Sequence, residues 1–417
     1  MFLHFIHVLS FTPLHTYPNF TMPPQKNTSR KVTSKATSKK KEAVPPSNLP
    51  TVPEYTPLVS RYEQHEAVGL PQEYCTSEMG IFKQLFVPDI WEAICANTNA
   101  YYRHRASNAE ESTMKPRLWR DITIGELKVW IGLLLYMGIV RCPSTADYWS
   151  EDCRQAPMSS MSLTRFHQIK RFLHVSPPES SPPESSEKKR EWWEKLEPMS
   201  SVAQQRCREC YLPSSNVAID EMMVKCEGRS AHVLTMKNKP IDQGYKLFTL
   251  ADHGYTYTWA YHSRSQGTAL ASAYKSAVIT TERRLCPTSR TCLHLALSLP
   301  YQTHQFNIYF DNYFTNIGLF ATLRDYGIGA CGMARTTVIP AELKVDKSLA
   351  CQELRWNDLF GTVQDNVLCG LWQDSTQVLV MSTIHDLQTG TTRLRRCPKE
   401  NQLDAKITRA VFGDEVR

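Results

Sequence analysis

The sequence has no apolar run long enough to cross a membrane as a helix. Residues 1–11 are apolar but too short for a span, and they lack the positively charged start and the small-residue cleavage site of a signal peptide. Residues 121–140 are mostly apolar, but a stretch of only about 15 residues favours a buried core helix. We therefore expect no membrane partner. Met22, just before a polar segment, is an alternative start.

Cysteine is also sparse. Thirteen cysteines in 417 residues are too few for a disulfide scaffold, and their scatter among apolar segments predicts free thiols in a reducing compartment. Cys207 and Cys210 have the spacing of half a zinc site. No second pair of this kind follows, and Cys226 and His232 are poorly spaced to complete the site. We favour two ordinary thiols over a zinc site.

Positive charge is concentrated in one segment. The formal net charge is +7, and residues 26–42 alone carry +6, because seven Lys and Arg residues there face only Glu42. The rest of the chain is therefore close to neutral. This segment is either a solubilising tail or a basic arm for nuclear import and phosphate contact. The second interpretation places the protein in the nucleus.

The length predicts more than one structural unit, since single cores rarely grow beyond roughly 250–300 residues. Composition changes at several points: a Pro-, Ser-, Thr- and Lys-rich start, a helical pattern, a tandem PPESS repeat and then short β-type runs. We expect a disordered basic arm (1–80), an all-α region (81–212) with a flexible loop (176–190), an α/β core (213–340), and a β-rich insertion with the end of the core (341–417).

Three segments of the all-α region have apolar residues at helical spacing, namely 82–106, 121–140 and 161–175. The second begins with Asp121 and Thr123, either of which is suited to cap a helix.

From residue 216 the spacing of the apolar residues changes from a helical to a strand-like pattern. Three strand-like runs (217–224, 246–252, 257–264) precede a helical stretch (269–285) and a fourth run (306–312). A helix (314–327) and another strand (329–335) follow, and 353–385 alternates like a small β unit. This α/β order is the one expected of an RNase H-like core.

Two aspartates come at points where carboxylates are unusual. Asp220 follows the apolar Val217–Ile219 and Asp311 follows the apolar strand that ends at Phe310. A carboxylate at a buried strand needs a pair, hydrogen bonds or a metal ion. Aspartates on adjacent strands can converge on Mg²⁺, which accepts a few carboxylates and keeps several waters. The alternative is that each aspartate caps its strand or pairs with Arg229 or Lys246.

Several long blocks resemble the piggyBac-type transposases of the DDE superfamily. Residues 216–252 resemble the block with the first catalytic aspartate, including its Gly-Arg turn and Gly-aromatic-Lys strand. Residues 308–335 resemble the second-aspartate block with its Asp-Asn-aromatic-Phe-Thr run. Residues 355–386 resemble the family's insertion, and 132–150 and 165–175 its helical dimerisation and DNA-binding region. The resemblance covers roughly residues 80–417 in the right order.

The resemblance implies that Asp220 and Asp311 are the first two members of a DDD triad that holds Mg²⁺. It also implies hydrolytic nicking at transposon ends, hairpin formation and strand transfer into target DNA, by a homodimer on double-stranded DNA. The third aspartate of the family lies in a Gly-Val-Asp-x-x-Asp-Gln block, after a segment like residues 407–417. Asp386, Asp404 and Asp414 lack that context. The family's cysteine-rich zinc module is also not found. We therefore expect little or no cleavage by these 417 residues.

Four basic residues flank the Asp220 strand and are candidate phosphate contacts: Lys225, Arg229, Lys237 and Lys239. The alternative is a solvated loop face. A second hypothesis for the whole chain is a transposase-derived DNA- or chromatin-binding protein without catalysis.

Overall fold

The computed structural model describes residues 45–72, 77–107, 119–150, 156–178, 192–237, 239–263, 267–269, 283–346, 353–355, 357–374 and 376–390. The α-helices are α2 (Glu78–Leu85), α3 (Pro88–Ser107), α4 (Ile124–Ile139), α5 (Leu163–Phe172), α6 (Met199–Glu209), α7 (Pro287–Ala296) and α8 (Ile317–Asp325). Short 3₁₀ helices are η1 (Pro46–Asn48), η3 (Ala146–Trp149), η4 (Ala156–Ser160), η5 (Glu194–Leu196) and η7 (Ala341–Leu343).

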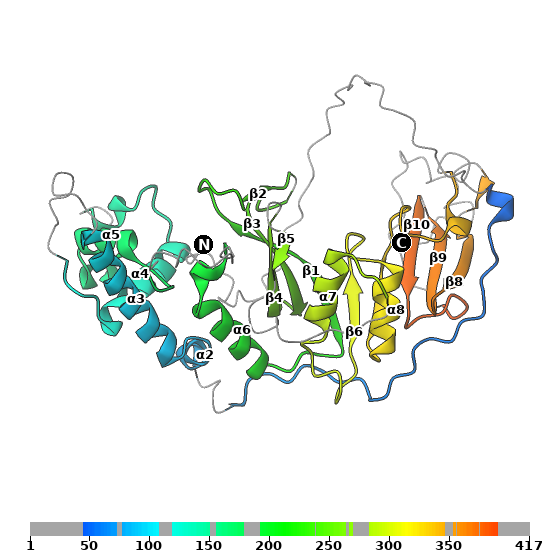
Figure 1. Cartoon of the computed structure of the whole chain (residues 1–417), viewed down its shortest axis with the longest axis horizontal. Helices are drawn as coiled ribbons and strands as arrows, with labels where there is room; N and C mark the ends of the chain where they lie inside the picture. The colour runs from blue at the N-terminus through cyan, green and yellow to red at the C-terminus, as the bar shows by residue number, and fades with distance from the viewer. Residues whose placement is uncertain are drawn as a thin grey trace, which may run out of the picture.

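The strands are β1 (Asn216–Lys225), β2 (Leu234–Thr235), β3 (Gln243–Asp252), β4 (Tyr255–Ser263), β5 (Gly267–Ala269), β6 (Asn307–Phe310), β7 (Gly329–Met333), β8 (Leu359–Gln364), β9 (Val367–Gln373) and β10 (Gln377–Ser382). Together they form one mixed sheet in the order β5-β4-β3-β1-β6-β7-β10-β9-β8, with β2 beside β3. In Figure 1 the helical unit lies at the left, the centre of the sheet in the middle and β8–β10 at the right.

The three expected helical segments are all helical. Residues 82–106 form parts of two helices, since Pro88 begins α3 after α2 has ended. Of the two cap candidates it is Thr123 that begins α4, because its side chain accepts the backbone N–H of Glu126. Phe166 and Ile169 of α5 are buried in the helical core together with Leu127 and Trp130 of α4.

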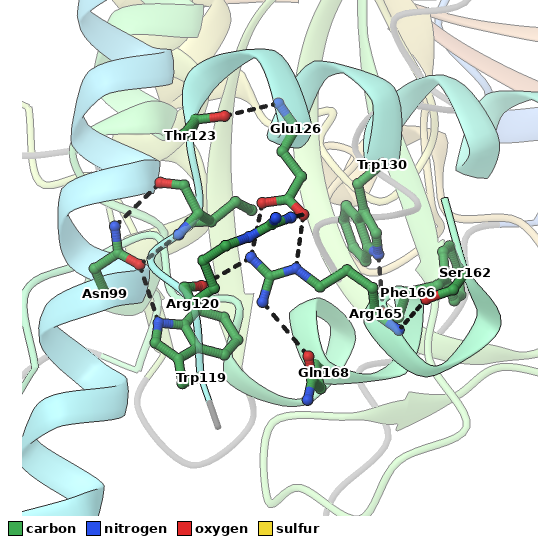
Figure 2. Close-up of polar contacts among 11 residues, drawn as sticks. Asn99, Trp119, Arg120, Thr123, Glu126, Trp130, Ser162, Arg165, Phe166 and Gln168 are labelled. Carbon is green, nitrogen blue, oxygen red and sulfur yellow. Dashed lines mark hydrogen bonds and ion pairs between the residues drawn. The ribbon is translucent and has the colours of Figure 1, made fainter. Parts of the chain in front are cut away.

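A partly buried ion pair joins α4 to α5 in this unit (Figure 2). Arg165 donates from Nε and Nη2 to the two carboxylate oxygens of Glu126, at 2.7 Å each, and Nη2 also donates to the Arg120 carbonyl at 2.8 Å. The Arg165 guanidinium lies 4.7 Å from the centre of the Trp119 ring. The hydrogen bonds that the Glu126 carboxylate accepts from Arg165 and from Arg120 lower the pKa of Glu126, although burial acts to raise it. The pair therefore fixes the helical unit from inside.

The middle of the sheet changes from antiparallel to parallel. Strand β1 is antiparallel to β3 but parallel to β6, and β6 is parallel to β7. Helix α7 precedes β6 and α8 connects β6 to β7, and both helices pack into the main core with Ile219 and Ile308. Residues 353–385 were expected to form a small β unit, and they contain β8–β10. These strands extend the same sheet, because β10 pairs with β7.

The expected helix at 269–285 lies largely outside the described residues. The helix described before β6 is α7, which begins at Pro287. Among the described residues, no helix combines the length and the apolar character that a membrane crossing requires.

Residues 45–72 form an extended strap along the sheet, seen as the blue trace at the lower edge of Figure 1. We expected residues 1–80 to be a disordered arm, and for this part the expectation is wrong. Leu49 is buried in the main core, Leu58 donates its N–H to the Thr383 carbonyl at 2.7 Å, and Val68 pairs with Leu212. The strap satisfies its backbone on neighbouring elements, so it needs few apolar side chains to stay ordered.

Candidate active site at the ends of strands β1 and β6

The register of the two parallel strands brings Asp220 and Asp311 together. Strand β1 pairs with β6 residue by residue up to Ile219 opposite Phe310, so the next residue of each segment is an aspartate. Neighbouring strands lie about 4.8 Å apart. The two aspartates are therefore neighbours at the point where the β1–β6 pairing ends, and both are exposed.

Each aspartate keeps oxygen atoms available. Asp220 Oδ1 accepts the N–H of Glu221 at 2.7 Å, and Asp311 Oδ1 accepts the N–H of Asn312 at 2.6 Å. Within the part of the chain that the structure describes, neither carboxylate has an ion-pair partner. The alternative of a pair with Arg229 or Lys246 is therefore wrong, since Lys246 binds Glu221 instead.

Glu221 is the acidic residue at this edge that is paired. Lys246 of β3 contacts its Oε2, and Lys239 lies 3.4 Å from its Oε1. Burial raises the pKa of Glu221, but the bonds and charges of the two lysines outweigh burial and leave the pKa below its ordinary value. Glu221 is thus held as an anion by its lysines.

The turn after β6 holds the Asp311 backbone in place. The N–H groups of Phe314 and Thr315 both donate to the Asp311 carbonyl, at 3.0 and 3.2 Å, and the Thr315 hydroxyl does so at 3.1 Å. Asn316 then caps α8 by accepting the N–H of Leu319 at 3.3 Å. This cap fixes where the helix after the strand begins.

The donor set at this edge fits a magnesium ion, though only in part. Two aspartate carboxylates offer the hard oxygen ligands that Mg²⁺ prefers, with the remaining positions left for water. No group of three or more His, Cys, Asp or Glu side chains arranged to hold a metal occurs among the described residues. Asp386 is another acidic residue of the described part, and its Oδ1 accepts the N–H groups of Gln388 and Thr389.

The four predicted phosphate contacts lie beyond the Asp220 end of β1. Lys225, Arg229, Lys237 and Lys239 are all exposed. Lys225 pairs with Glu227 at 2.9 Å and Lys239 with Glu221, so part of their charge is already balanced. The pairing of β3 with β1 and β2 brings these residues to the same end of the sheet.

The cysteine pair is not arranged as a metal site. Cys207 and Cys210 are buried free thiols, and burial raises the pKa of Cys207 to about 11. A thiol with a raised pKa is a poor metal ligand at neutral pH, because the thiolate is the binding form.

Sequence reasoning considered Lys246 only as a partner of an aspartate, and it missed Tyr313 and Arg335. Lys246 was available as a signal, because a lysine between apolar residues of a strand (Tyr245, Leu247) must find a partner when it is buried. The contacts of Tyr313 and Arg335 depend on the fold.

A hollow of about 250 Å³ opens at the other end of the same strands. Its lining includes Asn216, Gln305, Asn307 and His385, and neither Asp220 nor Asp311 belongs to it. The candidate metal site is therefore exposed at the end of the β1–β6 pairing and is not part of this pocket.

A family model described as "Transposase IS4" matches residues 77–407. The human protein "PiggyBac transposable element-derived protein 3" is 26% identical over 275 residues, which cover 64% of this chain and 43% of that protein. The human "PiggyBac transposable element-derived protein 5" is 30% identical over 97 residues, covering 22% of this chain and 18% of that protein. The chain thus spans less than half the length of these relatives.

One solved structure has a similar fold, the "Cryo-EM structure of piggyBac transposase synaptic complex with hairpin DNA (SNHP)". It superposes with a TM-score of 0.61 at 19% identity, covering 78% of this chain and 64% of that chain. At this identity the likeness speaks for the fold, and the family is established by the model that matches most of the sequence. The chain belongs to the family that this model describes as Transposase IS4, and it is similar to piggyBac-derived proteins.

Proposed function

We propose that this chain carries the metal-binding centre of a DDD-type DNA transposase, on a core of the RNase H-like type. The observation that supports the proposal most is the parallel register of β1 and β6, which leads from Ile219 and Phe310 directly to Asp220 and Asp311. In this assignment the two aspartates bind Mg²⁺.

The roles of the protein follow from this placement. A bound divalent ion supplies activation of water and stabilisation of the leaving 3′ oxygen in phosphodiester hydrolysis. Asp220 and Asp311 orient it from adjacent strands, and the turn after β6 keeps the second carboxylate at the strand edge.

The substrate is proposed to be double-stranded DNA. Four exposed basic residues (Lys225, Arg229, Lys237, Lys239) lie at the same end of β1 and are suited to phosphate contacts. The piggyBac transposase with the similar fold was solved as a synaptic complex with hairpin DNA. We extend this to a homodimer that acts on transposon ends in the nucleus.

A second candidate function is DNA binding without cleavage. It is favoured by the donor set, because two carboxylates without a third acidic partner in the described part of the chain hold two metal ions poorly. In this second candidate function, cleavage stays near background while metal and DNA binding are retained.

Mn²⁺ titration followed by electron paramagnetic resonance tests the metal assignment. Asp220→Asn and Asp311→Asn are each expected to weaken Mn²⁺ binding at least about tenfold. Asp386→Asn is the matched control, since it changes an exposed carboxylate that already accepts its own turn N–H groups. An equal loss in all three variants would contradict the two-aspartate assignment.

Fluorescence anisotropy with labelled hairpin DNA and a nicking assay in Mg²⁺ separate the two functions. Binding that weakens steeply with salt is expected of phosphate contacts. Nicking that disappears in Asp220→Asn would establish catalysis and exclude the second candidate, and the absence of both binding and nicking would exclude both.

A further inference from the structure

Lys246 is a buried lysine that the proposed chemistry does not use. It lies on β3 and is only 6% exposed, although lysines are among the residues least often buried. Its ammonium contacts the Glu221 carboxylate and lies 5.2 Å from the ring centre of Phe248 and 4.7 Å from that of Tyr313. A carboxylate and two aromatic faces thus compensate for lost hydration.

The contacts of this one ammonium reach both aspartate segments. Glu221 directly follows Asp220 and donates its N–H to the Asp220 carboxylate. Tyr313 lies in the turn after β6, two positions beyond Asp311, and the next residue, Phe314, donates its N–H to the Asp311 carbonyl. Lys246 therefore touches a neighbour of each aspartate from a third strand.

A second cation strengthens the Asp311 side of this arrangement. The Arg335 guanidinium lies 5.2 Å from the centre of the Tyr313 ring, and its Nε donates to Asn312 Oδ1 at 3.0 Å. Asn312 in turn donates its N–H to the Asp311 carboxylate at 2.6 Å. The Tyr313 ring is thus held by two cations, each linked to the backbone around an aspartate.

We propose that Lys246 is a positioning residue that sets the separation of the Asp220 and Asp311 carboxylates for a shared divalent cation. The inference rests on the proposed function. Two exposed carboxylates on adjacent strands repel each other, and a metal site needs its ligands held within about 0.5 Å of the productive geometry. Lys246 supplies this restraint because it bridges Glu221 and Tyr313 across three elements of the sheet edge.

The test compares the two lysines on Glu221. Lys246→Met removes the buried ammonium with little change in length, and Lys239→Met removes the exposed ammonium from the same carboxylate. We expect Lys246→Met to weaken Mn²⁺ binding about 10- to 100-fold, as for other residues that orient metal ligands, and Lys239→Met to change it less than about twofold.

Hydrogen exchange of the peptide that covers residues 308–316 gives a reading that needs no metal. The N–H groups of Asn312, Phe314 and Thr315 are bonded to Asp311 and report directly on the restraint. Faster exchange is expected in Lys246→Met and in Tyr313→Leu. The rate is expected to be unchanged in Lys239→Met and in Tyr313→Phe, which keeps the ring.

A double variant separates positioning from general instability. Lys246→Met alone leaves Glu221 without its buried partner and lowers stability for that reason. Lys246→Met combined with Glu221→Gln removes both charges, so thermal stability should recover while Mn²⁺ binding stays weak and exchange stays fast. Full recovery of Mn²⁺ binding together with stability would overturn the positioning role.

The two readings also separate failure of the inference from failure of the proposed function. If Mn²⁺ binding is insensitive to Asp220→Asn while exchange responds to Lys246→Met, the restraint exists and the metal assignment falls. If Mn²⁺ binds through the aspartates and Lys246→Met behaves like Lys239→Met in both measurements, the inference falls alone.

Discussion

The two ends of the parallel pairing between β1 and β6 use aspartate in opposite ways. At the first end, Asp252 of the neighbouring strand β3 has a fully buried side chain that accepts bonds from the Ser214 N–H (2.7 Å), the Ser214 hydroxyl (2.9 Å), the Tyr211 hydroxyl (3.0 Å) and His253 Nδ1 (2.5 Å). At the other end, Asp220 and Asp311 are exposed, and each accepts the N–H of the residue that follows it.

The comparison distinguishes a structural carboxylate from a candidate ligand. Asp252 has its oxygens saturated by protein donors, so it fixes the entry into β1 and has no capacity for a metal ion. Asp220 and Asp311 keep most of their acceptor capacity, so they are suited to an external ligand. Burial and donor count separate two roles that the residue type does not.

The largest expected effect is on folding, at the buried end. Asp252→Ala leaves the Ser214 and Tyr211 donors without their acceptor and should lower the free energy of unfolding by about 3–5 kcal/mol. Asp220→Ala should change it by less than about 0.5 kcal/mol, as for exposed positions. Urea denaturation followed by circular dichroism measures both, and equal losses would remove the distinction.

A smaller effect is expected from a pair of glycines, one at each end. A Cβ at Gly332 would lie 2.5 Å from Thr315 Oγ1 and 2.7 Å from the Phe310 carbonyl oxygen, so Gly332→Ala must displace the turn that holds Asp311. We expect it to weaken Mn²⁺ binding several-fold and to cost about 1–3 kcal/mol.

Gly254 provides the matched substitution in the turn after Asp252. It has a φ of +87° with nothing within 4 Å of an added Cβ, so Gly254→Ala strains the backbone alone and should cost about 1 kcal/mol. Mn²⁺ binding should not change. A loss of Mn²⁺ binding as large as that of Gly332→Ala would show that the two ends are coupled.

The smallest effect concerns acid stability. Burial raises the pKa of Asp252, but the bonds from Ser214, His253 and Tyr211 outweigh it, so the pKa lies below the ordinary 3.8. A lowered pKa contributes stability that is complete above the unfolded value and is lost as pH falls through the folded one. Denaturation midpoints measured downward from pH 5 should therefore fall less steeply in Asp252→Asn than in the wild type.

Local pattern predicted much of the candidate site. Asp220 and Asp311 could be chosen because each follows an apolar run. Their proximity depends on the parallel pairing of β1 with β6, which involves residues about 90 positions apart (for example, the Asn307–Asn216 contact at 91). Spacing along the chain does not encode that register.

Other features could not be predicted because their partners are distant. The Lys246–Glu221 pair requires β3 to lie beside β1, and the strap is ordered by backbone hydrogen bonds that its Pro- and Ser-rich composition does not reveal. Helix α7 was missed because its first half, Pro287–Thr291, is polar, so the apolar spacing covers only its last turn.

The strap also constrains when folding can be completed relative to synthesis of the chain. The Tyr55 hydroxyl donates to the Asn366 carbonyl, 311 positions later in the chain. At roughly 5–20 residues per second, a ribosome needs about 15 to 60 s to make the residues between them. Residues 45–72 therefore leave the ribosome long before their docking surface exists, and the segment synthesised near the start is among the last to reach its native place.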